Sequence, residues 1–290
     1  MRICLLALAL LTAGCASTKG TKVESTAARA LPGSLSAAVE SPYRSPENKL
    51  RDAARHPKET LEFFGLEPTM TVIEIAPGTG WYTEILAPYL SEKGTYIAAG
   101  PAASSGAYAA KNAEKIDAFR RRYPEVKVQS ANFNPPDELN IAPEGSADMV
   151  LTFRNVHNWA SKNNDAAAFA AFYKALKFGG ILGVVEHRAN ADAPNDDSGK
   201  SGYLKEFDVV KMAEKAGFRL VGRSDVNANP KDTKDHPEGV WTLPPSLRLG
   251  DKDRAKYVAI GESDRMTLKF KKLEKLAPGE KSKKRSKRKH

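Results

Sequence analysis

The sequence contains almost no cysteine. Of its 290 residues only Cys4 and Cys15 are cysteines, and both lie in the first fifteen positions. If this segment is processed, Cys15 alone remains, which excludes an intramolecular disulfide. The fold must then depend on buried apolar surface, and the hydrophobic content of 41% is ordinary for a globular protein. We expect one main domain with appendages.

The apolar run near the start of the chain, from Ile3 to Leu11, is too short to span a bilayer as a mature helix. It follows a basic residue and leads into Thr12–Cys15, an arrangement typical of a secretory signal. The ending resembles a bacterial lipoprotein signal, although Thr12 stands where that signal usually has Leu. The resemblance implies removal of residues 1–14, lipidation of Cys15 and anchoring to the membrane on the periplasmic side. A cytosolic protein with a chance apolar start is the alternative.

A basic stripe is missing from the body of the sequence, although the formal net charge is +10. Seven of the Lys and Arg residues lie in Lys281–His290, which leaves +3 for the rest of the chain. We therefore expect no nucleic-acid partner. Residues 276–290 are expected to form a disordered basic tail, either fully solvated or attracted to an anionic envelope surface in a salt-dependent way.

The segment between the signal and the domain, residues 15–42, is rich in Ala, Ser, Thr, Gly and Pro and is expected to be a flexible tether. Order is expected from Ser45 onward, because a Ser followed by Pro46 is typical of a helix start. This helix is expected to run to about His56, and a second helix from Pro57 to Gly65. The main domain is then expected to cover residues 43–275.

Apolar strand patterns alternate with helical patterns through this domain. The expected strands are 71–76, 95–99, 126–131, 147–153, 180–186, 218–222 and 266–271, and the expected helices are 82–90, 107–122, 164–177 and 207–216. This order predicts an α/β fold, a Rossmann-like, doubly wound, seven-stranded sheet that is mostly parallel with an antiparallel last strand. Residues 228–264 are expected to be a long insertion before that strand, of the kind that forms functional lids or disordered segments.

The first expected strand leads into a glycine-rich turn at Gly78 and Gly80 and then into a helix. Such a corner lets a ligand approach the backbone and presents unpaired helix N–H groups. A dinucleotide-binding site requires the pattern Gly-x-Gly-x-x-Gly, but Thr83 occupies the position of the third glycine. A nicotinamide-dependent oxidoreductase is therefore the third-ranked interpretation.

Three motifs resemble those of the class I S-adenosylmethionine-dependent methyltransferases, and more particularly of exported bacterial members. The first is Glu74–Gly80, in which Ala76 replaces the first glycine of the family's pattern. The second, Leu176–Leu182, is similar to the family's Leu-Lys-Pro-Gly-Gly turn into its fifth strand. The third, Ala147–Phe153, stands in the place of its fourth strand. The resemblance covers about residues 45–272 and implies S-adenosylmethionine as the cofactor.

The resemblance also implies which residues hold this cofactor. Glu74 would orient the turn or the methionine amino group, and Gly78 and Gly80 would admit the cofactor. Ala76, in the same turn, is a further candidate. The remaining candidates follow later strands: Gly100 by the ribose, Asn132 and Phe133 by the adenine, and Arg154 and Asn155 by the cofactor carboxylate or an acidic substrate. The acid that usually holds the ribose is absent, because Gly100 and its neighbours are not acidic.

Two polar clusters follow the fourth and fifth expected strands, where ligands bind in open α/β sheets. We expect His157 to act as a general base for a protonated acceptor, with His187 and Glu186 as the next candidates. Structural roles are the alternative for each of them. The spacing of the three residues does not predict a metal site, and none is assigned.

The sequence therefore predicts methyl transfer to an unknown small molecule or envelope component. The competing hypothesis is a non-catalytic exported binding or scaffold module that retains the fold. S-adenosylmethionine is made in the cytosol, and the sequence does not explain how an exported enzyme would obtain it. This supports the non-catalytic alternative.

Overall fold

The computed structural model describes residues 29–194, 196 and 199–273. The predicted signal peptide, the lipidation of Cys15 and the basic tail lie outside the described residues. Among the described helices, none combines the length and the apolar character that crossing a membrane requires.

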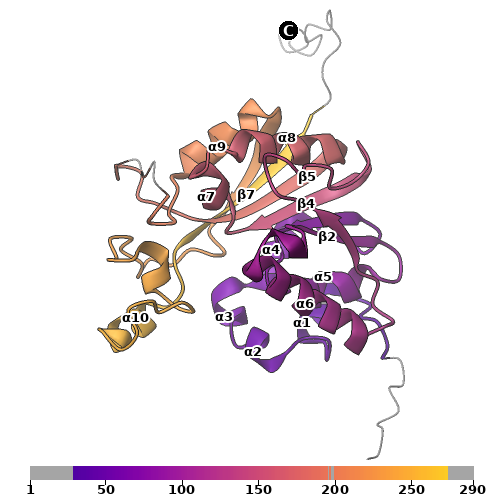
Figure 1. Cartoon of the computed structure of the whole chain (residues 1–290), viewed down its shortest axis with the longest axis horizontal. Coiled ribbons are helices and arrows are strands. Elements are labelled where there is room, and N and C mark those ends of the chain that lie inside the picture. The colour runs from indigo at the N-terminus through magenta and orange to yellow at the C-terminus, as the bar shows by residue number, and fades with distance from the viewer. Residues whose placement is uncertain (1–28, 195, 197–198, 274–290) are drawn as a thin grey trace, which may run out of the picture.

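Seven strands form one sheet in the order β3-β2-β1-β4-β5-β7-β6 (Figure 1). The strands are β1 (Thr71–Ile75), β2 (Thr95–Gly100), β3 (Gln129–Asn132), β4 (Ala147–Phe153), β5 (Leu176–His187), β6 (Phe218–Ser224) and β7 (Arg265–Lys272). The first five are parallel, and β7 runs antiparallel to both of its neighbours, β5 and β6. The predicted fold class is confirmed.

Helices cover both faces of the sheet, as Figure 1 shows, with α1, α4, α5 and α6 on one side and α8 and α9 on the other. The helices are α1 (Leu35–Glu40), α2 (Pro46–Lys49), α3 (Asp52–Arg55), α4 (Pro57–Phe64), α5 (Thr83–Leu90), α6 (Ala107–Arg122), α7 (Val156–Ala160), α8 (Asp165–Ala175), α9 (Glu206–Lys215) and α10 (Arg254–Ile260). Two 3₁₀ turns, η1 (Ala103–Ser105) and η2 (Gly239–Thr242), complete the described elements.

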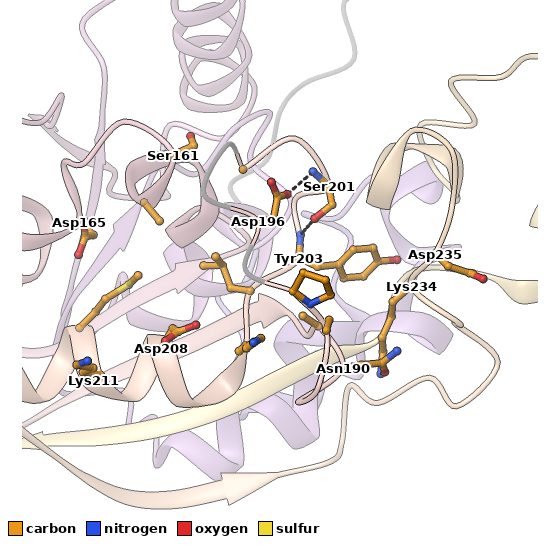
Figure 2. A pocket seen from close by; sticks show the side chains of 18 of the residues that line it. Ser161, Asp165, Asn190, Asp196, Ser201, Tyr203, Asp208, Lys211, Lys234 and Asp235 are labelled. Carbon is orange, nitrogen blue, oxygen red and sulfur yellow. Dashed lines mark hydrogen bonds between the residues drawn. The ribbon is translucent and has the colours of Figure 1, made fainter.

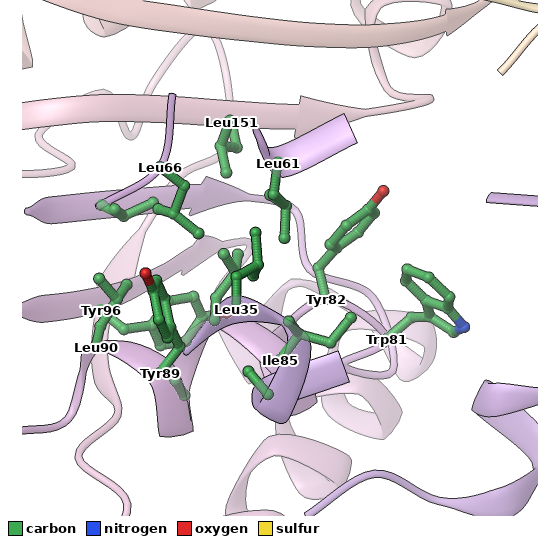
Figure 3. Close-up of a cluster of buried hydrophobic side chains, with 14 of the residues drawn as sticks. Leu35, Leu61, Leu66, Trp81, Tyr82, Ile85, Tyr89, Leu90, Tyr96 and Leu151 are labelled. Carbon is green, nitrogen blue, oxygen red and sulfur yellow. The ribbon is translucent and has the colours of Figure 1, made fainter. Parts of the chain in front are cut away.

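The central strand β1 divides the core in two, because successive side chains of a strand point to opposite faces. Val72 joins the buried cluster beneath α1, α4 and α5, where Leu61, Leu66 and Leu151 also lie (Figure 3). Ile73 and Ile75 join the opposite cluster, which packs against α8 and α9. Burial on both faces explains why the strand is a nearly continuous apolar run.

The predicted tether extends too far, because part of it is a helix. Within residues 15–42, α1 spans Leu35–Glu40 and buries Leu35, Ala38 and Val39 against the domain. The Ser34 hydroxyl accepts a hydrogen bond from the Ala37 amide at 3.1 Å and so caps the helix start. A prediction from composition misses this helix, because its short apolar face lies within a segment rich in alanine.

Several element boundaries also differ from the predictions. The single helix expected from Ser45 to His56 is two short helices, α2 and α3. The helix expected over 164–177 ends at Ala175, since β5 begins at Leu176. The third strand is short and begins at Gln129. Within the insertion 228–264, all residues are described and include η2 and α10.

Candidate active site

The turn after β1 adopts the backbone that its glycines suggest. Gly78 and Gly80 have φ of +60° and +92°, a region that favours glycine. A Cβ added at Gly78 would meet no atom within 4 Å, so this part of the turn faces open space. Ala76 has φ of +49° although it is not glycine, and its amide donates to the Ala99 carbonyl at 2.7 Å. The structure thus explains the first glycine of the resembled motif, which Ala76 replaces here.

Glu74, the last polar side chain of β1, is buried and ties the strand to its neighbours. Its Oε2 accepts hydrogen bonds from the Tyr96 hydroxyl at 2.6 Å and from the Thr83 hydroxyl at 3.3 Å. Burial raises the pKa of Glu74 to about 7, although these two hydrogen bonds act in the opposite direction. Since Thr83 is the first residue of α5, these hydrogen bonds join β1 to the start of the helix that follows the turn.

Two aromatic residues directly after the turn belong to the same site, and the sequence prediction did not include them. The Tyr82 ring stacks on Phe153 at the end of β4, with ring centroids 3.7 Å apart. The Trp81 ring has Arg55 on its face, with the guanidinium carbon 4.7 Å from the ring centroid. Their position directly after Gly80 in the sequence could have identified them as site residues.

The ribose and adenine candidates lie at the ends of β2 and β3. Gly100 pairs with Asn132 in the parallel register, and Asn132 is exposed. Phe133 is in the core, where its ring packs against Trp159 and Phe172 at centroid distances of 5.6 and 5.4 Å. The expectation that the Phe133 ring flanks an adenine is therefore wrong, since packing on these two aromatic rings holds it away from the surface.

Asn155 and Arg154 follow β4, next to the turn. The Asn155 amide group donates to the carbonyls of Ile75 and Phe153, each at 3.2 Å, so this side chain joins the ends of β1 and β4. Arg154 is half-buried and has φ of +61°. Burial lowers the pKa of Arg154, and the charge of Glu262 partly offsets this effect. Asn155 thus has a structural role beside the predicted cofactor contact.

The three predicted catalytic residues lie together at the carboxyl ends of β4 and β5. The Nδ1 atom of His157 is 2.9 Å from Glu186 Oε1, and both side chains are buried. Glu186 Oε2 also accepts from the backbone amides of Val156 and His157 at 2.6 and 3.3 Å. Because an ionised carboxylate only accepts hydrogen bonds, Nδ1 carries the proton and Nε2 of His157 carries the lone pair.

His187 completes this cluster from the end of β5. Its Nδ1 is 2.5 Å from the Ser263 hydroxyl, and its ring centroid is 5.4 Å from that of His157. Burial lowers the pKa of His187 well below its usual range, and the charges of Arg154 and Arg265 act in the same direction. One nitrogen or oxygen from each of His157, Glu186 and His187 lies within 4.8 Å of the others, a grouping that could hold a metal ion. Sequence spacing does not predict this grouping, since the fold brings His157 of α7 beside Glu186 and His187 of β5.

A group of arginines, also outside the sequence prediction, borders the histidines. The Glu262 carboxylate accepts from Arg51 Nε at 2.7 Å, from Arg55 Nε at 3.4 Å and from Arg265 Nη1 at 3.1 Å. Burial would raise the pKa of Glu262, but these three charges lower it below its usual value. Burial also lowers the pKa of Arg265 to about 10. Arg265 pairs with His187 across β5 and β7, which brings the arginines to the histidine cluster.

The residues that line a cavity of about 630 Å³ are different from those of the Gly78 turn and the His157 cluster. Figure 2 shows its lining, which comes from the end of α7, the loop that follows β5, helix α9 and residues 233–235, with Ser161, Tyr203 and Asp208 among the side chains drawn. Among the described residues that line it, none is a predicted catalytic or cofactor residue. The convergence of polar groups therefore places the candidate site at the Gly78 turn and the His157 cluster.

The fold is similar to that of several solved methyltransferase structures. A S-adenosylmethionine-dependent methyltransferase from Aquifex aeolicus matches with a TM-score of 0.51 and 16% identity over 83% of this chain and 99% of that one. A putative sarcosine dimethylglycine methyltransferase from Galdieria sulphuraria matches with a TM-score of 0.54 and 12% identity, over 79% of this chain and 88% of that one. Phosphoethanolamine N-methyltransferase 2 of Haemonchus contortus, in complex with S-adenosylmethionine, has a TM-score of 0.51 and 15% identity over 76% of this chain, which spans 53% of that protein.

At these identities the similarity establishes the fold and not the activity. A solved structure described as a [4+2]-cyclase, SpnF, has a TM-score of 0.50 and 18% identity over 76% of this chain and 81% of that one. No protein-family model matches the chain, and neither does any curated protein sequence.

Proposed function

We propose that the chain binds S-adenosylmethionine at the turn between β1 and α5 and transfers its methyl group to an acceptor at the His157 cluster. The observation that carries this proposal is the position of the His157–Glu186 pair at the carboxyl ends of β4 and β5, the next two strands beside β1 and on the same side as the glycine turn. The open space above Gly78 provides room for a ligand against the backbone. Asn155 holds the ends of β1 and β4 together, so the two halves of the site have a fixed separation.

Bound S-adenosylmethionine would supply a methyl group on a sulfonium: the nucleophile would bond to the methyl carbon in line, and the electron pair of the broken C–S bond would stay on sulfur. The protein contributes mainly by positioning the reactants. His157 is oriented by Glu186, and its Nε2 would take the proton of an acceptor that arrives as an alcohol, phenol or ammonium. Val156 and His157 amides hold Glu186 in place, so the base has a defined direction.

Calorimetric titration of the full chain tests this proposal. We expect S-adenosylmethionine and S-adenosylhomocysteine to bind and NAD not to bind, because the turn lacks a third glycine. His157→Ala should leave the affinity for S-adenosylhomocysteine unchanged, since His157 acts on the acceptor. If neither sulfur compound binds at millimolar concentration, the enzyme proposal is wrong, and binding of NAD alone would favour an oxidoreductase instead.

A second candidate function, a non-catalytic binding module, is supported by two observations. The end of β2 carries Gly100 where a ribose-binding acid is expected, and Phe133 is withdrawn into the core. Both features remove groups that would hold the adenosyl part of the cofactor. Binding of S-adenosylhomocysteine without methyl transfer to any acceptor would support this candidate.

We also propose that the protein is exported and anchored by a lipid on Cys15, with a small molecule or an envelope component as the acceptor. The support is the sequence of the first fifteen residues. Multiple acyl chains would anchor the chain stably, at about 0.8 kcal/mol for each buried CH₂ group. In bacterial cells, Cys15→Ser should move the protein out of the membrane fraction and Cys4→Ser should not. Equal membrane recovery of both variants would refute the lipid anchor.

A further inference from the structure

The buried charges around Glu262 do not balance. Arg55 and Arg265 are buried and Arg51 is partly exposed, yet all three share the one Glu262 carboxylate. Burying charges without enough partners is costly. The arginines come from the α3 region and from β7, far apart in sequence, so the fold assembles this excess of positive charge.

Arg154 adds a fourth cation, and its guanidinium has no partner of its own in the part of the chain that the structure describes. Among the described residues, none forms a hydrogen bond or a salt bridge with that group. The carboxylates whose charges act on Arg154 are Glu262, with the larger effect, and Glu186, the partner of His157. Arg154 is only half-buried, and its guanidinium carries five N–H donors. It is therefore available to a ligand.

His157, Glu186 and His187 are grouped closely enough for a metal ion, but a cation is a poor ligand for this cluster. The carboxylate of Glu186 is occupied by hydrogen bonds: Oε2 accepts two backbone amides, and Oε1 accepts the His187 amide at 2.8 Å and faces His157 Nδ1. The charges of Arg154, Arg265 and Arg55 reach His187. They would repel a divalent cation and attract an anion.

We propose that the methyl acceptor is an acidic molecule and that Arg154 binds its anionic group, a carboxylate or a phosphate. This inference rests on the proposed function, since it concerns the acceptor of the same site. Arginine suits the role because its planar fork binds either anion through two parallel hydrogen bonds. The neighbouring Arg55 and Arg265 strengthen the positive potential, and both form ion pairs with Glu262. His157 then lies beside the bound acceptor as the base.

Titration of inorganic phosphate and of acetate into the full chain saturated with S-adenosylhomocysteine tests this assignment. The principal variant is Arg154→Asn, because Asn tolerates the left-handed backbone at this position. Arg154→Lys keeps the positive charge but removes the planar guanidinium that forms two parallel hydrogen bonds. Arg121→Asn is the matched control, since Arg121 is exposed on α6 and pairs with Glu114. All variants keep the basic tail, so its contribution cancels. Thermal unfolding shows whether each variant is folded.

We expect the anions to bind the wild type and Arg121→Asn equally. Arg154→Asn should weaken their binding about tenfold or more, since hydrogen bonds to charged groups are among the strong ones, and Arg154→Lys should be intermediate. Unchanged anion binding in Arg154→Asn would overturn the proposal. Competition between phosphate and S-adenosylhomocysteine would also overturn it, since Arg154 would then hold the cofactor carboxylate.

The two proposals can fail separately. If S-adenosylhomocysteine does not bind, the proposed function fails, and the same anion titrations without it still decide whether Arg154 forms an anion site. If S-adenosylhomocysteine binds and Arg154→Asn has no effect on the anions, only the acidic acceptor is refuted.

Discussion

At the scale of single residues, the turn after β1 is held in a conformation that its sequence resists. Ala76 has φ of +49°, and its amide hydrogen bond to Ala99 keeps it there. A left-handed alanine costs about 1 kcal/mol relative to glycine. Loss of the glycine found in the resembled motif thus leaves the turn in place but strained.

Ala76→Gly should therefore raise the free energy of unfolding, by about 0.5–1 kcal/mol, because glycine adopts this φ without strain. Chemical denaturation measures the change. The matched control is Ala102→Gly, at φ of −57°, where the added chain flexibility should lower stability instead. A loss of stability in both variants would contradict the strained turn.

Glu74 makes a second prediction at this scale. Its folded-state pKa of about 7 lies above its usual value of 4.5. The folded state therefore binds more protons between these values, and stability falls as the pH rises from about 4.5 to 7, then levels off. Glu74→Gln mimics the protonated form and should be more stable than the wild type at pH 8, by about 3 kcal/mol. The difference should vanish near pH 4.

Denaturation curves over this pH range measure the Glu74 effect. Glu92→Gln, an exposed glutamate after α5, is the control and should show no such pH-dependent difference. A Glu74→Gln protein that is less stable than the wild type at every pH would contradict the burial argument.

At the scale of elements, the close approach of α4 to β5 depends on Gly183. A Cβ at this position would lie 2.7 Å from Leu151 Cδ2 and 2.9 Å from the Phe64 ring. Gly183→Ala should lower the free energy of unfolding by about 1–3 kcal/mol through overpacking. Gly33→Ala is the control, because a Cβ there meets no atom within 4 Å. Thermal unfolding that is equal for both variants would refute the tight α4–β5 contact.

The strands were predictable where burial on both faces produces an apolar run. β1 and β4 are such strands, and the placement of His157 and Glu186 at neighbouring strand ends followed from them. Short elements were not predictable, since α1 and α7 have few residues and take their stability from packing. The side chain of Phe133 was misplaced because alternation in a strand does not reveal what happens one residue beyond it.

At the scale of the whole molecule, Glu262 joins the start of the domain to its last strand. Its partners Arg51 and Arg265 lie 211 and 3 residues away. No periodicity or motif marks such a pair, which is why the arginine cluster could not be found in the sequence. The Gly78 turn could be found, because its residues are contiguous.

Glu262→Gln should lower the free energy of unfolding by about 3–5 kcal/mol, since it leaves buried arginines without a carboxylate. Chemical denaturation measures this loss. Glu238→Gln is the control, because Glu238 pairs with Arg248 at the surface and such pairs contribute about 0–1 kcal/mol. Equal small effects in the two variants would mean that the arginines do not depend on Glu262.

The central claim, that the turn between β1 and α5 is a methyl-donor site, is tested most directly by a crystal structure of the chain with S-adenosylhomocysteine. We predict electron density for the ligand against the backbone of Gly78 and Gly80, with its sulfur atom on the side of the turn that faces His157. Density in the cavity between α9 and the loop after β5, or no density at saturating ligand, would contradict the claim.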